Sequence, residues 1–323
     1  MRPPEPPPTS RPSQMRRYRA ARRPPSVLTR RELLLGGAGV CAALAAGAAV
    51  ERGRIVGEVK HLLTHSEHGL VPTHQAATVV YRSFHSRVLG KEVAYGIAWP
   101  AGARAGEPLP VCFCLPGRGG GPRSILGAQL PFADYLDEAV KSTGKPFALA
   151  AIDGGQSYWH HRVGGEDRMA MLIEEFIPLC ERRYHLGGSR SRRAAMGWSM
   201  GGYGVLLATE TYRRLFAAVV ATSPAVWPSY AAMMEGPRDA FDSAADFAAH
   251  DVIGHAALLA GTPLLVECGT ADPFYPYVRD LCDGLPAGAH FQFGPGGHDY
   301  VCWRTFEPAA LEFTARHLGV ART

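Results

Sequence analysis

Apolar and polar positions follow a regular order from about residue 77 to the carboxyl terminus. Short runs of β-branched, aromatic or small apolar residues, bounded by glycine, proline or polar residues, predict strands. These strands are expected at 77–80, 93–98, 109–115, 147–152, 193–197, 217–222, 263–268 and 290–293. Amphipathic segments between them predict helices at 131–142, 166–184, 200–211, 275–283 and 306–317. Strands that alternate with helices predict an α/β fold, in which helices cover both faces of a mostly parallel central sheet.

One segment interrupts this order. Residues 227–259 contain Met233, Met234 and an acidic, alanine-rich stretch, and they show no strand pattern. We expect this segment to form a short helical insertion over the candidate site.

The first 50 residues differ in composition from the rest of the chain. The first thirty are dominated by proline and arginine, which cannot build an apolar core, so we expect them to stay unfolded. Arg30 and Arg31 then precede an uncharged Gly/Ala/Leu stretch over 33–50. This pattern resembles a twin-arginine export signal, and Ala46-Gly47-Ala48 fits a signal peptidase site. An uncleaved membrane anchor is the alternative, because the stretch approaches the length that spans a bilayer.

Length and charge limit the domain organisation of the chain and the classes of partner that it can bind. The 323 residues suffice for one large domain and an extension, so we expect a leader over 1–50, a linker over 51–76 and a catalytic domain over 77–323. The formal charge of +5 lies in the leader, whose nine arginines and two acids leave 25 basic and 27 acidic residues for the remainder. A nearly neutral domain without a basic face argues against nucleic acid as a partner.

The strongest chemical signal is the run Gly197-Trp198-Ser199-Met200-Gly201-Gly202. A Gly-x-Ser-x-Gly pattern alone is common in loops, and a helix-capping serine is the structural alternative. Here the run joins a predicted strand to a predicted helix, which is the setting of a nucleophilic serine held on a strained turn. Glycines flank the serine because side chains there would collide with the neighbouring strand and helix. We therefore expect Ser199 to be a nucleophile.

A serine nucleophile needs a histidine that accepts its proton and a carboxylate that orients the histidine. His298 follows the last predicted strand on a glycine-rich loop and precedes the last helix. Asp272 lies on the loop past the carboxyl end of the 263–268 strand, whereas Glu267 lies inside that strand. We assign Asp272 as the acid, which gives the order Ser, Asp, His along the chain that is typical of α/β-hydrolases.

Ester hydrolysis also requires donors for the oxyanion that develops on the substrate. The backbone amide of Met200, directly after the nucleophile, is one expected donor. The amide of Arg118, in the glycine loop over 117–121, is the other. This loop lacks the Lys-Ser/Thr ending and the spacing of nucleotide-binding loops.

Four motifs resemble the esterase D and trehalose mycolyltransferase branch of the α/β-hydrolases. They are Leu115-Pro116-Gly117-Arg118, Asp153-Gly154-Gly155-Gln156-Ser157-Tyr158, the run around Ser199, and Gly297-His298-Asp299-Tyr300-Val301-Cys302-Trp303. The resemblance implies acyl-ester chemistry through an acyl-serine, with no metal and no organic cofactor. Pro116 and Asp272 stand where the mycolyltransferases carry an aspartate and a glutamate, which favours hydrolysis over mycolyl transfer.

Residues near these motifs are candidates for binding the substrate. Polar and aromatic side chains of the second and fourth motifs could line an acyl or alcohol pocket, although aromatic clusters are as often plain packing. The candidates are Gln156, Ser157, Tyr158, Trp159 and Trp303.

Six cysteines follow the leader, and none has the spacing of a zinc site. We expect mostly buried thiols. Cys180 and Cys282 lie on predicted helices, and one disulfide that involves a helix-borne cysteine stays open, with its pairing not set by the sequence.

Three functions remain open. The first is an extracytoplasmic carboxylesterase, secreted or envelope-associated, that acts on acyl-ester or lipid substrates and is exported by the Tat machinery. The second is an acyltransferase to a carbohydrate hydroxyl, and the third is a non-catalytic cell-surface binding protein on a hydrolase scaffold. The oligomeric state stays open.

Overall fold

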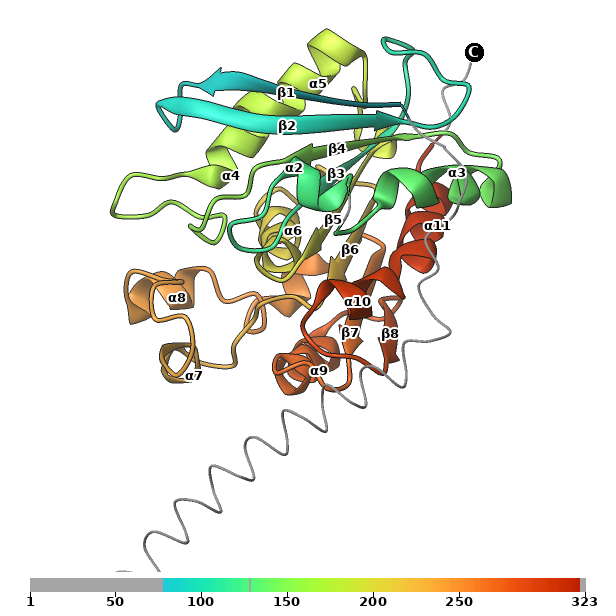
Figure 1. Ribbon diagram of the computed structural model, residues 1–323. Coiled ribbons are helices and arrows are strands. Elements are labelled where there is room, and N and C mark those ends of the chain that lie inside the picture. The colour runs from blue at the N-terminus through green and yellow to red at the C-terminus, as the bar shows by residue number, and fades with distance from the viewer. Residues whose placement is uncertain (1–77, 128, 320–323) are drawn as a thin grey trace, which may run out of the picture. The chain divides into compact units, whose positions relative to one another are not determined.

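The computed structural model describes residues 78–127 and 129–319 (Figure 1). The expected leader over 1–50 and linker over 51–76 lie outside the described residues, so both stay predictions. Within the described residues, no helix has the length and hydropathy needed to cross a membrane.

Eight strands form one sheet in the order β1-β2-β4-β3-β5-β6-β7-β8. The strands are β1 (Thr78–Ser86), β2 (Lys91–Trp99), β3 (Val111–Leu115), β4 (Ala148–Ile152), β5 (Arg193–Trp198), β6 (Ala218–Thr222), β7 (Leu264–Gly269) and β8 (His290–Gly294). β2 pairs antiparallel with both β1 and β4, and all the other pairs are parallel. The sequence prediction of a mostly parallel α/β sheet is confirmed.

Two separate apolar clusters cover the two faces of the sheet. Side chains of successive strand residues point to opposite faces, so Phe113 lies in one cluster while Cys112 and Cys114 lie in the other. The Phe113 face is covered by α5 (Ile177–Tyr184), α6 (Met200–Thr211) and α9 (Tyr275–Gly284). The opposite face is covered by α2 (Pro122–Ile125), α3 (Phe132–Thr143), α10 (Tyr300–Arg304) and α11 (Glu307–His317).

The helix predicted over 166–184 differs in detail from the expectation. It consists of α4 (Arg168–Ala170), a π-helical segment (Met171–Phe176) and α5. Pro178 explains the wider turn, because proline has no amide to donate and its ring collides with the carbonyl four residues earlier. The helix ends at His185, whose φ of 57° is left-handed.

The segment that interrupts the strand–helix order is helical, as expected. It contains α7 (Tyr230–Met234), α8 (Ala244–Ala249) and a 3-10 turn (Ala256–Leu259). Ser229 and Ser243 cap α7 and α8, each accepting a hydrogen bond from an amide of the first turn. Figure 1 shows α7 and α8 at the lower left of the domain, with α7 to the left of α9.

All six cysteines of the described residues are buried free thiols. The helix-borne disulfide that the sequence left open is therefore absent from them. Cys180 and Cys282 instead fill space in the cluster on the Phe113 face.

Candidate active site

Ser199 lies on a sharp turn between β5 and α6. Its φ of 53° and ψ of −119° are strained for a residue with a side chain. A Cβ on Gly197 would lie 2.2 Å from Gly201 O, and one on Gly201 would lie 1.9 Å from Leu115 O in β3. The flanking glycines are thus required by close backbone approach, as the sequence predicted. The turn is held by hydrogen bonds from Ser199 N to Thr222 O and from Ala225 N to Ser199 O.

Three loops bring Ser199, His298 and Asp272 into one line. The Ser199 hydroxyl is 2.8 Å from His298 Nε2, and His298 Nδ1 is 2.8 Å from Asp272 Oδ2. In the tautomer that satisfies both contacts, Nδ1–H donates to the carboxylate and the serine O–H donates to Nε2. Asp272 also accepts a hydrogen bond from Phe274 N at 2.8 Å, which fixes its second oxygen. The carboxylate is fully buried, while His298 is partly exposed.

Glu267, the alternative acid, has a different role in the structure. It is fully buried in β7 and accepts a hydrogen bond from the Thr222 hydroxyl at 2.6 Å. Burial raises the pKa of Glu267 to about 8. The carboxylate that contacts His298 is Asp272, as the sequence reasoning preferred.

Two backbone amides belong to segments that lie beside Ser199. Met200 is the first residue of α6, so its amide has no acceptor within the helix. The loop of Gly117 and Arg118 lies beside the nucleophile, because a Cβ on Gly117 would be 3.5 Å from Ser199 Cβ. Within the described residues, no hydrogen bond engages the amide of Arg118 or that of Met200. Both predicted oxyanion donors are therefore available to a bound substrate.

Aromatic rings surround His298. The rings of Phe274 and Trp303 each have centroids 5.1 Å from the imidazole, and Trp227 of the insertion packs on Phe274 at 5.3 Å. Trp303 was a predicted substrate-binding residue, and its ring contacts His298 while remaining buried. Trp227 and Phe274 were not singled out from the sequence, although Phe274 follows Asp272 by only two residues.

A polar cavity of about 320 Å³ lies next to the oxyanion loop. Its lining includes Arg118, Gln156, Ser157 and Asp239. Gln156 is exposed, whereas the Ser157 hydroxyl is buried and has no hydrogen-bond partner among the described residues. The Arg118 guanidinium pairs with the Asp239 carboxylate of the insertion, with 3.0 Å between Nη1 and Oδ1. This pairing lowers the pKa of Asp239, and no pattern in the sequence indicated the pair.

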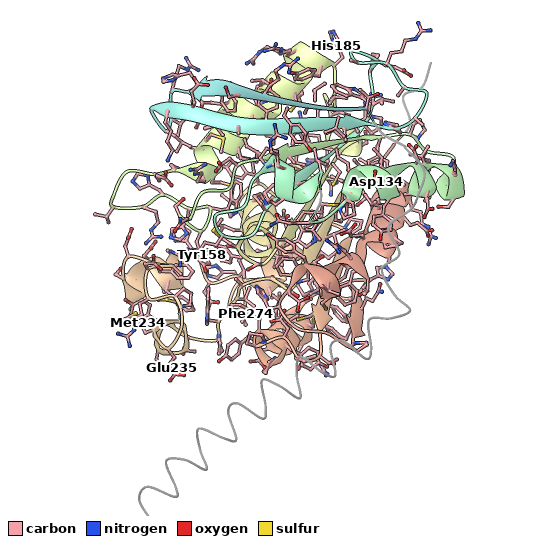
Figure 2. The ribbon with its side chains drawn as sticks, viewed as in Figure 1. Asp134, Tyr158, His185, Met234, Glu235 and Phe274 are labelled. Atoms are coloured by element: carbon pink, nitrogen blue, oxygen red, sulfur yellow. The ribbon has the colours of Figure 1, made fainter. Side chains whose placement is uncertain are left out.

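Tyr158 lies between the oxyanion loop and the insertion. Its ring packs against Trp227 at 5.7 Å and lies under the Arg118 guanidinium at 5.9 Å. Figure 2 shows Tyr158 and Phe274 on the same side of the sheet as the insertion. The ring is 4% exposed, so Tyr158 supports the wall of the site more than it offers surface to a ligand.

Trp159 is a correction to the predicted substrate-binding set. Its side chain is completely buried, and a Cβ on Gly204 of α6 would lie 2.4 Å from the Trp159 ring. A large aromatic ring behind the loop stabilises the fold by burying apolar area, and this ring offers no surface to a substrate. Composition could not separate the two roles, because both favour tryptophan.

A family model described as "Putative esterase" matches residues 86–276. Two curated proteins of Mycobacterium tuberculosis, "Esterase MT1326" and "Esterase Rv1288", are 25% identical to this chain over 144 residues. The match covers 43% of this chain and 30% of each curated protein, so it spans less than a third of their length.

Solved structures of esterases share the fold. A ferulic acid esterase superposes with a TM-score of 0.64 at 22% identity, covering 75% of this chain and 99% of its own. An S-formylglutathione hydrolase from Agrobacterium tumefaciens gives 0.62 at 19% identity, with 76% and 98% covered. The fluorophosphonate-binding serine hydrolase FphF of Staphylococcus aureus gives 0.61 at 19% identity, with 74% and 98% covered. Since the family model matches more than half of the chain, this protein belongs to that esterase family, whose members are serine hydrolases of carboxylic esters.

Proposed function

We propose that this protein is a carboxylesterase that hydrolyses acyl esters through an acyl-enzyme on Ser199. One observation carries the proposal: Ser199, His298 and Asp272 form a continuous hydrogen-bonded line with 2.8 Å at each step. A hydroxyl, an imidazole and a buried carboxylate in this order are the arrangement that activates a serine. The free amides beside Ser199 and the esterase family support the same chemistry.

Acylation begins when Ser199 Oγ attacks the ester carbonyl carbon and its proton moves to His298 Nε2. Asp272 stabilises the resulting imidazolium through Nδ1–H, and the amides of Met200 and Arg118 donate to the oxyanion. When the tetrahedral intermediate collapses, the bond to the alcohol oxygen breaks, and His298 donates its proton to that oxygen. The alcohol leaves, and the acyl group stays on Ser199.

Deacylation uses the same groups with water. His298 Nε2 removes a proton from a water molecule, whose oxygen attacks the acyl carbonyl. The second tetrahedral intermediate collapses with return of the proton to Ser199 Oγ, which releases the carboxylic acid. The aromatic side chains Phe274 and Trp303 limit solvent access to His298 and favour an apolar acyl group.

The test is turnover of p-nitrophenyl acyl esters by wild type, Ser199→Ala and Ser142→Ala. Ser142 lies on α3, where it contacts Ala139 and Glu312, so its loss is a matched control. We expect turnover by wild type and Ser142→Ala, with loss of about four orders of magnitude or more in Ser199→Ala. Equal turnover by all three proteins would refute the proposal.

A second candidate function is transfer of the acyl group to a carbohydrate hydroxyl. The polar cavity beside Arg118 favours it, because Gln156, Ser157 and Asp239 offer donors and acceptors that suit a polyhydroxylated acceptor. The same assay with added trehalose distinguishes the two. Product found only as acylated sugar would favour the transferase, and free acid in its presence would favour the esterase.

We also propose that the protein acts outside the cytoplasm. The proposal depends on Arg30, Arg31 and the uncharged stretch that follows them. A fusion of residues 1–50 to a folded reporter should be exported, and Arg30→Lys with Arg31→Lys should block its export. Export that is indifferent to both substitutions would contradict the twin-arginine route.

A further inference from the structure

Three side chains with metal-binding atoms meet where α8 of the insertion approaches the loop after β4. They are His160, Asp246 and His250, and one ligand atom of each lies within 4.8 Å of the others. His160 Nε2 is 3.2 Å from Asp246 Oδ2, and His250 Nδ1 is 2.9 Å from Asp246 Oδ1. Within the described ranges, no other group of three such side chains comes together in this way.

The spacing of these residues suits a metal ion. Asp246 lies in α8, and His250 directly follows the helix. The two residues are four positions apart and therefore lie on the same face of the helix. His160 comes from a loop 86 residues earlier and supplies the third ligand. Ligand atoms of a tetrahedral zinc site are about 3.3 Å apart, given bonds of about 2.0 Å. The separations of 2.9 and 3.2 Å run to the two different oxygens of Asp246, and one ligand atom from each of the three residues lies within 4.8 Å of the others.

The hydrogen bonds of His160 direct a lone pair at the carboxylate. His160 Nδ1 lies 2.9 Å from Tyr158 O, which can only accept, so Nδ1 carries a proton. The side chain is 1% exposed. With the proton on Nδ1 of a neutral ring, Nε2 carries a lone pair that faces Asp246 Oδ2, and a cation can bind to both atoms.

The cluster is buried on one side and open on the other. The side-chain exposure rises from 1% for His160 to 16% for Asp246 and 28% for His250. An ion can therefore enter past His250, and a water molecule can complete its coordination. His250 Nδ1 also lies 2.9 Å from Asp246 O, a hydrogen bond that the ion would replace.

We propose that His160, Asp246 and His250 bind one Zn²⁺ ion, with water as the fourth ligand, and that the ion fastens the insertion to the loop after β4. Two imidazoles and one carboxylate are a ligand set that zinc accepts. Ser199, His298 and Asp272 take no part in this site, so zinc binding and ester hydrolysis can be tested separately. The role of the ion is to stabilise the part of the protein that carries Asp239.

Zinc binding is measured on the full chain, purified without a polyhistidine tag and stripped of metal, in competition with a chromophoric zinc indicator. We expect one Zn²⁺ per chain, with affinity at least about tenfold weaker in Asp246→Asn and in His250→Gln. His161→Gln is the matched control, because His161 is exposed and pairs with Asp167. Wild type that binds no zinc, or equal binding by all four proteins, would overturn the proposal.

Thermal unfolding gives a second readout. Zinc at about 100 times its Kd should raise the Tm of wild type and His161→Gln by roughly 5 °C or more, and a chelator should reverse the rise. His250→Gln, whose side chain is partly exposed, should fold and show no rise. Co²⁺ bound to wild type should give the visible absorption of a four-coordinate site, which His250→Gln should lose. A rise of equal size in His250→Gln contradicts the site.

Discussion

The reacting groups and the insertion beside them are held in different ways. The loops of Ser199, Asp272 and His298 leave the parallel strands β5, β7 and β8, and backbone hydrogen bonds such as Asp272 N to Gly269 O fix them. The insertion over 227–259 packs Met233, Phe241 and Leu259 into the apolar core, and it also carries ion pairs at its surface, with Arg118–Asp239 and Arg162–Asp242 among them. Exposed ion pairs contribute little stability, about 0 to 1 kcal/mol each. The reacting groups are thus held in place by backbone hydrogen bonds, while the surface ion pairs of the insertion can be lost at little cost in stability.

The largest effect should come from Asp272→Asn, in the loops that carry the reacting groups. An asparagine keeps the shape of the buried side chain but no longer stabilises the imidazolium or holds the reactive tautomer. We expect kcat for a p-nitrophenyl ester to fall about 10⁴-fold with KM little changed. Asp283→Asn, at the exposed end of α9, serves as the control and should keep wild-type rates. A loss below tenfold would show that Asp272 does not orient His298.

Gly201→Ala, at the turn that carries Ser199, should destabilise the folded protein. The new Cβ would lie 1.9 Å from Leu115 O, and a backbone atom of a central strand cannot move away. We expect a loss of about 3 kcal/mol or more in the free energy of unfolding, measured by urea titration. Gly236→Ala is the comparison, because the nearest atom there is Met233 O at 3.7 Å. Equal stability of the two variants would contradict the close packing of α6 on β3.

Glu267→Gln should change how stability depends on pH. Burial raises the pKa of Glu267 to about 8 in the folded state, whereas the unfolded chain has the ordinary value of 4.5. Between these values the folded state keeps a proton that the unfolded state loses, so stability falls as pH rises, by up to about 1.4 kcal/mol per unit. This contribution is complete below pH 4.5 and lost above about pH 8.

Urea titrations from pH 5 to pH 9 test this assignment. Glu267→Gln should show a shallower decline than wild type, and Glu138→Gln, an exposed residue of α3, should follow wild type. Parallel curves for all three proteins would mean that Glu267 is ionised in the folded state.

The smallest effect should come from a substitution in the insertion over 227–259. Asp239→Asn removes the charge partner of Arg118 and leaves the guanidinium free beside the oxyanion loop. We expect a change of about two- to fivefold in KM, with stability altered by less than about 1 kcal/mol. Glu235→Gln, at the exposed end of α7 (Figure 2), is the matched control in the same insertion. A hundredfold loss of kcat would place this pair with the reacting groups instead.

The same two regions differ in how far the sequence predicted them. The central strands and the longer helices were predicted nearly at their observed bounds, because burial imposes a regular apolar period, whereas β1 was predicted over 77–80 and extends to Ser86. Ser199, Asp272 and His298 could be found because each must follow a strand at the same edge of the sheet, in an order set by the fold. These constraints are local or topological, and a single sequence contains both.

Contacts between segments that are distant along the chain could not be predicted from the sequence. Arg118 and Asp239 are 121 residues apart, and His160 meets Asp246 across 86 residues. No short motif marks either pair. Trp159 was placed with the substrate because it follows a polar motif, yet its left-handed φ of 58° directs the ring to the core. Side-chain direction in irregular loops depends on backbone angles that composition does not encode.

Labelling with a fluorophosphonate tests the central claim most directly. We expect one covalent adduct per chain, mapped to Ser199 by peptide mass analysis, with labelling lost in Ser199→Ala and strongly slowed in Asp272→Asn. Absence of labelling in wild type, or labelling of Ser199→Ala at the wild-type rate, would contradict Ser199 as the nucleophile.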